Sequence, residues 1–203
     1  MGVNRVRSIA LLLLTVGVIG LVRGLCTSAA QRLYYVSKFG ACRDDMACIA
    51  RNCATAAQLY GVNYYFFLWA AERAYDASLG GGEDAARMGR LARRWCDRGV
   101  ALNPYNSSLR LLRTRLLQEE DPAAAAAYWQ RYVDWNPWHA HHHAVLTELY
   151  ADAGQWRRAL LALRFIRGRP YHAEARRALR AALEREKTSP PDLSTLDIER
   201  ALP

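Results

Sequence analysis

The sequence predicts an all-α protein, built as a solenoid of about three to four helical hairpins that follows one apolar helix. Ala, Leu, Arg and Glu, which favour helices, dominate the chain, and strand formers are sparse beyond its N-terminal part. The phrases around Asn103-Pro104 and Asn136-Pro137 are nearly alike and lie 33 residues apart, and Pro170 follows Pro137 at the same interval. A fixed period of this length is typical of stacked supersecondary units.

Residues 1–30 form the expected signal-anchor or signal peptide. Two arginines, Arg5 and Arg7, precede an uncharged run of 15 residues from Ser8 to Val22. As a helix this run is about 22 Å long, whereas a bilayer core needs about 30 Å. Continuing to Ala30, with the Arg23 side chain reaching to the membrane surface, gives a full span.

Two hypotheses remain for this segment, a retained anchor and a cleaved secretory signal. The cleaved signal is favoured by the small residues Ser28 and Ala30 behind a short apolar core. With the basic start inside the cell, both hypotheses place the rest of the chain outside the cytoplasm. We expect a single-pass membrane protein, in contact with the bilayer through residues 8–30, whose C-terminal domain is extracytoplasmic, and periplasmic if the source is bacterial.

The remaining chain divides by pattern into three parts. Residues 31–83 are expected to form a divergent helical unit, with helices over 42–59 and 63–79. Residues 84–187 carry the regular repeats and a C-terminal capping helix, and residues 188–203 form a flexible tail. Within the repeats, Asp121-Pro122 is a helix start and Gly154 a helix stop.

Apolar positions in the repeats keep a period of 34 residues, which predicts their core. Trp95, Trp129 and Leu163 follow one another at this interval, as do the small residues Ala125 and Ala159. Trp129 and Leu163 each lie four positions after one of these alanines, on the same helix face. We expect the alanines to allow close helix packing and the bulky side chains to fill the interior.

These positions resemble the tetratricopeptide repeat (TPR) family over residues 84–187. The usual Trp-Leu-Gly of the first helix is missing, since Gly is absent after Leu112 and Leu146. The resemblance rests on Leu109, Leu112, Ala125, Trp129 and Pro137 in one unit and on Leu146, Tyr150, Gly154, Ala159 and Pro170 in the next.

The resemblance implies a concave groove, lined by the first helix of each unit, in which a protein partner binds. Arg110 would pair with a partner carboxylate and Leu117 would accept an apolar side chain. The full set of partner-binding residues expected from it is Arg110, Thr114, Leu117, His141, Glu148 and Asp152.

Five cysteines are compatible with export. Cys26 lies in the apolar segment, and the other four allow up to two disulfides by three pairings, or four buried thiols. Cys48 and Cys53 are poorly placed to bridge each other on one helix, so a partner from another helix is expected.

The chain is basic, with a net charge of +9, and 26 of its 28 basic residues are Arg. A dense series runs from Arg87 to Arg98 and continues to Arg115, offset only by Asp97. A solvated outer face, a docking surface for an acidic peptide and contact with membrane headgroups remain as interpretations. Nucleic acid is not expected as a partner, because it is scarce outside the cell.

No catalytic motif or cofactor fingerprint occurs in the sequence, so we expect a non-enzymatic protein without a cofactor. The principal hypothesis is a membrane-attached scaffold or adaptor that assembles an envelope complex. One alternative is an accessory subunit with a structural role in a larger membrane complex. A weaker alternative is metal binding through His139, His142 and His143, whose spacing brings imidazoles to one helix face.

Overall fold

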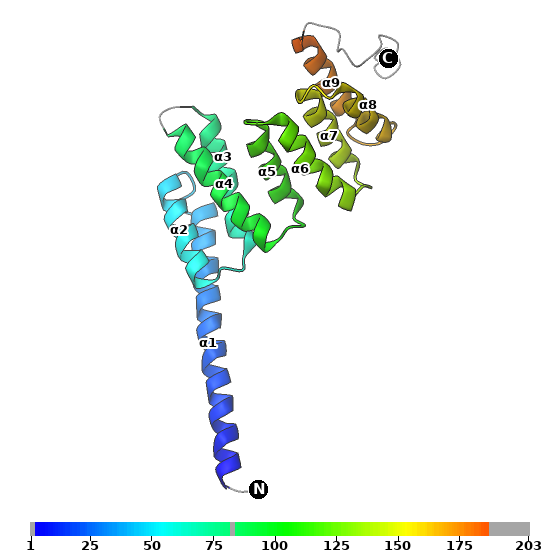
Figure 1. The fold of residues 1–203 in the computed structure, drawn as a ribbon. Helices are drawn as coiled ribbons and strands as arrows, with labels where there is room; N and C mark the ends of the chain where they lie inside the picture. Colours follow the sequence, from blue (N-terminus) through cyan, green and yellow to red (C-terminus); the bar gives the residue numbers. More distant parts are fainter. Residues whose placement is uncertain (1–2, 82–83, 187–203) are drawn as a thin grey trace. The chain divides into compact units, whose positions relative to one another are not determined.

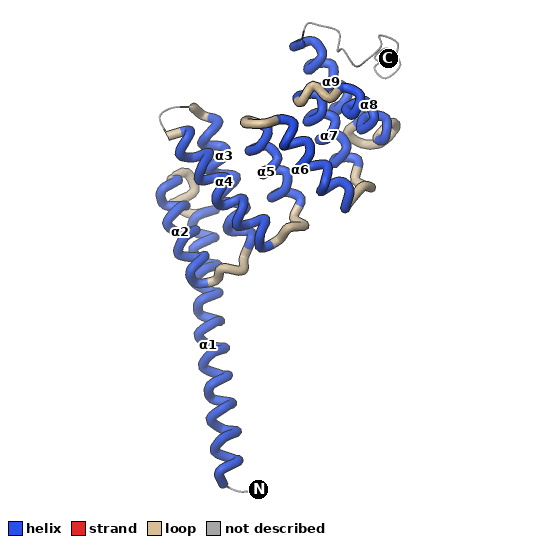
Figure 2. Tube along the Cα trace, in the orientation of Figure 1, coloured by secondary structure: helices blue, strands red, loops and turns tan. Residues whose placement is uncertain are grey.

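The computed structural model describes residues 3–81 and 84–186. Throughout these residues the chain forms helices and loops without a strand, which confirms the all-α prediction for them (Figure 2). Two compact units divide the chain, Met1–Asn106 and Ser107–Pro203, and each is described by itself. The division falls after Asn106, whereas the sequence placed one between 83 and 84. The predicted flexible tail, 188–203, lies outside the described residues.

The described part of the first unit forms four helices, each of which packs against the next along the chain (Figure 1). The third and fourth helices are joined by a contact between the Arg98 guanidinium of the fourth and the ring of Phe67 of the third, 5.9 Å from its centroid. The helices are α1 (Val3–Phe39), α2 (Met46–Leu59), α3 (Tyr64–Leu79) and α4 (Ala85–Leu102).

Helix α1 has two parts with different surroundings. From Val6 to Ala29 no residue is buried, and the aliphatic side chains of this stretch stand open. From Ala30 onward the same uninterrupted helix packs into the unit: Ala30 is fully buried and Tyr34 meets the ring of Phe66 edge to face. By length and composition α1 can cross a membrane. Figure 1 shows its free part projecting beyond the other helices of this unit.

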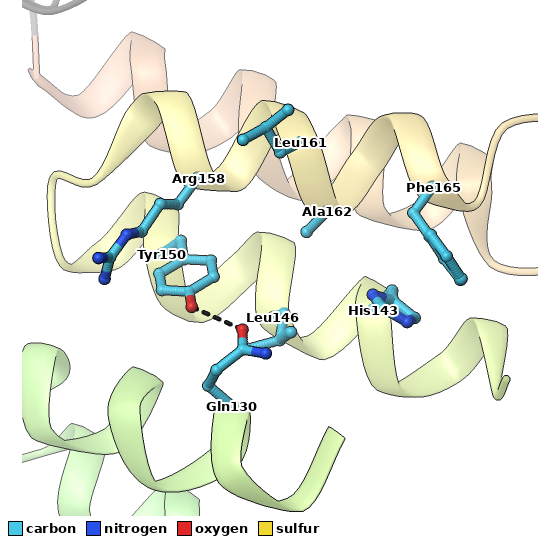
Figure 3. A pocket seen from close by; sticks show the side chains of 8 residues that line it. All are labelled: Gln130, His143, Leu146, Tyr150, Arg158, Leu161, Ala162 and Phe165. Atoms are coloured by element: carbon cyan, nitrogen blue, oxygen red, sulfur yellow. Dashed lines mark hydrogen bonds between the residues drawn. The ribbon is translucent and has the colours of Figure 1, made fainter. Parts of the chain in front are cut away.

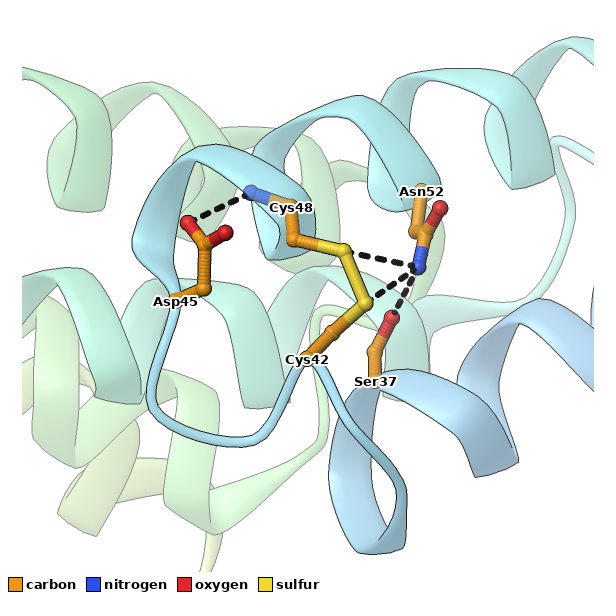
Figure 4. Close-up of a disulfide and its surroundings, with 5 residues drawn as sticks. All are labelled: Ser37, Cys42, Asp45, Cys48 and Asn52. Atoms are coloured by element: carbon orange, nitrogen blue, oxygen red, sulfur yellow. Dashed lines mark hydrogen bonds between the residues drawn. A yellow bond between two sulfur atoms is a disulfide. The ribbon is translucent and has the colours of Figure 1, made fainter.

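A disulfide between Cys42 and Cys48 closes the loop that joins α1 to α2 (Figure 4). The loop ends at Asp45, whose carboxylate accepts a hydrogen bond from the Cys48 amide at 3.0 Å and so caps α2. This corrects two expectations. The helix begins at Met46 rather than near 42, and Cys48 finds its partner in the adjacent loop, not in another helix. Cys53 and Cys96 are buried and are not part of this disulfide.

Residues 107–186 of the second unit form five helices, and α7 is central among them because α6, α8 and α9 all pack on it (Figure 1). Two predicted caps are confirmed: the Asp121 carboxylate accepts from the Ala124 amide at 2.9 Å, and Gly154 follows α7 with φ +67°. The helices are α5 (Ser107–Gln118), α6 (Pro122–Trp135), α7 (Ala140–Asp152), α8 (Trp156–Phe165) and α9 (His172–Glu186).

The core of the second unit uses the residues that the 34-residue period singled out. Ala125 and Ala159 are fully buried, and Trp129 and Leu163 beside them are buried to 1% exposure or less. The Trp129 indole donates a hydrogen bond to the His142 carbonyl at 3.0 Å, which ties α6 to the first turn of α7. The predicted roles of these four positions, small residues at the helix contact and bulky ones in the interior, are confirmed.

Candidate functional site

A hollow of about 340 Å³ lies at the N-terminal ends of α5 and α7. Its floor is aromatic, with Trp129 and Tyr132 buried beneath it, and its walls carry hydroxyls and imidazoles. We call it the α5–α7 hollow. It is lined by Ser107, Ser108, Leu111, Trp129, Tyr132, Asn136, His139, His141, His142 and Tyr171.

Farther along the same helices, long polar side chains join α5, α7 and α9 in what we call the polar row. Arg115 of α5 donates two hydrogen bonds to the Glu148 carboxylate of α7, at 2.7 and 3.0 Å. The Gln118 amide donates to Asp152 at 2.7 Å, and Asp152 also accepts from Arg185 of α9 at 2.9 Å. The charges of Glu148 and Asp152 are therefore already matched within the chain.

Three residues of the predicted set therefore lie on the α7 face that carries the hollow and the polar row. His141 lines the hollow, with its ring edge-on to Tyr171 at 5.1 Å between centroids. Glu148 and Asp152 belong to the polar row. The structure brings these three together on one helix but gives the two carboxylates partners from neighbouring helices, so a ligand's cation would have to displace those partners.

The three predicted residues on α5 need correction, because they lie on a different row of that helix. Thr114 is fully buried and its hydroxyl donates to the Arg110 carbonyl at 2.8 Å, so it offers nothing to a partner. The Arg110 guanidinium lies over the ring of Tyr128 at 5.1 Å. Leu117 is half-buried against the core of the unit. The contacts with α7 and the hollow come instead from Ser108, Leu111, Arg115 and Gln118.

The interval of the repeat is enough to predict which residues of α5 face α7. Glu148 minus 33 is Arg115, and Asp152 minus 34 is Gln118, which are the two hydrogen-bond pairs that the structure shows. His141 minus 33 is Ser108, which lines the hollow with it. Transferring the α7 residues onto α5 by the repeat interval would have predicted the row, whereas 110, 114 and 117 fall one to two positions away from it.

The histidines between 139 and 143 spread over several contacts instead of converging. His139 stacks on the buried His142 at 4.9 Å between centroids. A ring nitrogen of His142 lies 3.4 Å from the Asn136 carbonyl, and one of His143 lies 2.8 Å from the Pro137 carbonyl. Among the described residues, no three His, Cys, Asp or Glu side chains are grouped as metal ligands. This geometry does not support the metal-binding alternative.

One exposed aromatic side chain, Tyr171, lines the hollow, and two others, Trp135 and Trp138, directly precede the lining residues Asn136 and His139 in the sequence; sequence reasoning missed all three. Trp138 is 79% exposed, Trp135 58% and Tyr171 45%. Trp138 and Tyr171 each follow the proline of a repeat, 33 positions apart, so the period contained this signal too. Tyr171 has φ +68°, a backbone conformation that costs a non-glycine residue about 1–3 kcal/mol. That conformation holds its ring on His141 at the edge of the hollow.

A second hollow of about 450 Å³ lies between α6 and α8, with α7 as its floor (Figure 3). It is mainly apolar, and Leu161 and Phe165 of α8 stand exposed beside it. The Tyr150 hydroxyl donates to Gln130 at 2.7 Å across its base, and His143 stacks on Phe165 at 3.9 Å between centroids. This hollow contains none of the predicted partner-binding residues.

The first part of the arginine series, from Arg87 to Arg98, lies along α4 in the first unit, and its continuation to Arg115 lies on α5 in the second. Arg87, Arg90 and Arg94 are exposed beside a hollow of about 330 Å³, whose other wall is formed by Met46, Ala47 and Ala50 of α2. Arg87 pairs with Asp84 at 3.1 Å, both side chains being largely exposed. The spacing of these arginines makes one outward row, as the interpretation of a solvated or docking face requires.

Comparison with known proteins adds no identity to this geometry: no protein-family model matches the chain, and no curated protein matches it significantly.

Proposed function

We propose that this protein is a non-enzymatic, membrane-attached adaptor of TPR-like architecture, which binds a segment of a protein partner at the α5–α7 hollow. The observation that carries this proposal is that an exposed aromatic side chain, Tyr171, lines a hollow with an aromatic floor and polar walls. The exposed Trp138 directly precedes His139 of the lining in the sequence, and Trp and Tyr are the residues that most often dominate the binding energy of protein interfaces.

The chemistry of the hollow fits an extended segment that offers both an apolar side chain and hydrogen-bonding groups. Its aromatic floor accepts an apolar side chain, while the Ser107 and Ser108 hydroxyls and the His141 ring offer hydrogen bonds to peptide groups or carboxylates. The polar row fixes α5 and α7 relative to each other within the unit, which keeps the hollow open without a ligand. Such preorganisation reduces the ordering cost of binding.

Capture of partners from native membranes in mild detergent tests this proposal. The full-length tagged protein is compared with Tyr171→Gly and Trp138→Ala, and with the control Leu161→Ala, whose side chain is 58% exposed on α8. Glycine adopts a positive φ without strain, so Tyr171→Gly removes the ring and keeps the backbone. We expect both rim variants to lose at least about ten-fold in captured partner while Leu161→Ala keeps it. Equal capture by all four proteins would contradict the proposed site.

Membrane attachment is proposed through α1, with both units on the extracytoplasmic side. Its open apolar part, Val6–Ala29, is about 36 Å long as a helix, enough for a bilayer core of about 30 Å. The Cys42–Cys48 disulfide directly after α1 favours an oxidising compartment for that loop, because cytosolic thiols are kept reduced. Protease protection of the C-terminal units in intact cells checks this orientation.

A second candidate function, an accessory subunit held within a membrane complex, is favoured by one feature of α1. Gly20 and Gly24 are spaced as in helices that pack closely in bilayers, and nothing lies within 4 Å of a side chain placed at either one. In this case Gly20→Leu and Gly24→Leu should release the protein from its complex, with Val22→Leu as control. In the adaptor case only the rim variants should do so.

A further inference from the structure

We propose that the α2–α3 corner of the first unit rests in the headgroup region of the same bilayer that α1 crosses. The corner is defined by Tyr60, Val62 and Tyr65. This inference rests on the proposed membrane span of α1 and adds a second contact, made by the folded unit itself with the lipid surface. The corner would contact the lipid headgroups on the side of the membrane where the first unit lies.

The direction of α2 places the corner beside the point where α1 changes from exposed to buried, at Ala30. Cys48 is bonded to Cys42, and one turn later Asn52 donates to the Ser37 hydroxyl at 2.8 Å (Figure 4). As α2 proceeds, its contacts therefore move back along the chain toward the N-terminus. Continuing for the remaining turns of α2 to its end brings the chain beside Ala30, the first fully buried residue of α1.

The loop from 60 to 63 then turns the chain and begins α3 at the same end. Tyr34 of α1 packs against Phe66 in the first turn of α3, at 5.2 Å between ring centroids. Tyr65, one residue before Phe66, therefore lies at this end of the unit, whereas Leu79 lies at the other end of the 16-residue helix, about 22 Å away.

The side chains at this corner suit a lipid interface. Val62 is 65% exposed and Tyr65 54%, and Tyr60 is 37% exposed. Tyr64 stacks on Tyr65 with centroids 4.2 Å apart, which holds the two rings together at the surface. Tyrosine is enriched where membranes meet water, because its ring is apolar and its hydroxyl is polar. In water alone this cluster would leave an apolar patch uncovered.

The length of α1 brings the lipid to the corner. Residues 8–29 make a helix of about 33 Å, so a bilayer core of about 30 Å ends close to Ala30. The headgroup region extends several ångströms farther on each side, to the level of Tyr60 and Val62. If the core ended at Arg23 instead, the corner would stand about 10 Å farther out, in water. The exposed aromatic cluster favours the first position.

The test places a tryptophan at each end of the unit in the full-length protein, reconstituted in phospholipid vesicles with or without bromine on the acyl chains near the headgroup. Val62→Trp reports on the corner. Leu79→Trp is its matched control, since Leu79 is an aliphatic residue with 63% exposure against 65% for Val62. Tyr65→Trp is a second, more conservative reporter of the corner. The emission of the unsubstituted protein is subtracted from each.

We expect the added emission of Val62→Trp and Tyr65→Trp to be blue-shifted and largely quenched by the brominated lipid, and that of Leu79→Trp to be unaffected. Resistance to alkaline extraction is measured on the same vesicles and reports on the span alone. A protein that resists extraction while Val62→Trp and Tyr65→Trp behave like Leu79→Trp overturns the interfacial contact but not the anchor. A protein that is extracted overturns the anchor itself. Quenching of all three variants also overturns the inference, because lipid would then reach the far end of α3 at Leu79 as readily as the corner.

Discussion

Arg115 and Glu148 form a two-pronged ion pair between α5 and α7, with N–O distances of 2.7 and 3.0 Å, and they lie 33 positions apart, the interval of the repeat. Both side chains are about two-thirds buried, at 31% and 35% exposure. This pair therefore joins two helices through residues that occupy the same position in successive 33-residue intervals. About one turn later, Gln118 of α5 and Asp152 of α7 form a second such hydrogen bond.

A double-mutant cycle on this pair should give a coupling energy of about 1 kcal/mol, because the geometry is bidentate and water is partly excluded. The variants are Arg115→Met, Glu148→Gln and their combination, and the free energy of unfolding is measured by urea denaturation of the full chain in detergent. The exposed pair of Asp84 and Arg87 serves as control, with an expected coupling of about 0.2 kcal/mol. A coupling no larger than that of the control would show that the polar row does not stabilise the unit.

Replacement by phenylalanine should lower the stability of the second unit strongly at one tryptophan and hardly at all at another. Trp129 is fully buried and its indole nitrogen is bonded to the His142 carbonyl, so Trp129→Phe should cost about 2–4 kcal/mol. Trp138 is 79% exposed, and Trp138→Phe should change stability by less than about 0.5 kcal/mol. Thermal unfolding of the two variants measures the difference. Similar losses in both would contradict the assignment of Trp129 to the core.

Acidification should destabilise the second unit through His142. Burial lowers the pKa of this imidazole below its ordinary value, an effect that the hydrogen bond to the Asn136 carbonyl only partly opposes. The folded state therefore favours the neutral ring, and stability is present above the unfolded pKa and is lost as the pH falls through the lowered folded pKa. Unfolding free energies from about pH 7.5 to about pH 5 should fall less steeply for His142→Phe than for the natural protein. Equal slopes would contradict this role, since the other histidines are common to both proteins.

The cysteines should differ sharply in reactivity. Burial raises the pKa of the Cys53 thiol to about 12, an effect that the charge of Arg98 only partly opposes, so almost no thiolate exists at neutral pH. Alkylation of the folded protein should leave Cys53 and Cys96 unmodified, and unfolding without reductant should expose both. Cys42 and Cys48 should react only after reduction. Intact mass counts the added groups, and modification of Cys42 and Cys48 without reductant would exclude the disulfide.

The protein isolated from membranes should have its full mass of 22.9 kDa. Ala30, the residue after which a signal peptidase would cut, is fully buried inside a continuous helix that carries Tyr34 into the core. Cleavage after Ala30 would remove this buried residue from the packed unit, so the structure favours retention of the anchor. Mass spectrometry of the isolated protein measures this, and a mass lacking residues 1–30 would show a secreted form.

The partner-binding residues predicted from the sequence lie in two different surroundings. On α7, His141 lines the hollow, and Glu148 and Asp152 lie on the same helix face. On α5, Thr114 is buried and Arg110 lies over the ring of Tyr128 of α6. The amphipathic pattern of α5 is weak because arginines occur all around it, so periodicity alone does not show which row of this helix meets α7.

The sequence by itself determined the helices, their caps and the buried positions of the repeats, since these depend on residues within a few turns of one another. Asp121 caps the start of α6 and Gly154 follows the end of α7, as the sequence predicts. Trp129 and Leu163 are buried in the core, as their 34-residue spacing predicts. Only the tertiary structure decided that Arg115 reaches Glu148 and that Tyr34 of α1 packs against Phe66 in the first turn of α3. Those relationships depend on the rotation and direction of packed helices, which contacts between distant residues set and local sequence does not encode.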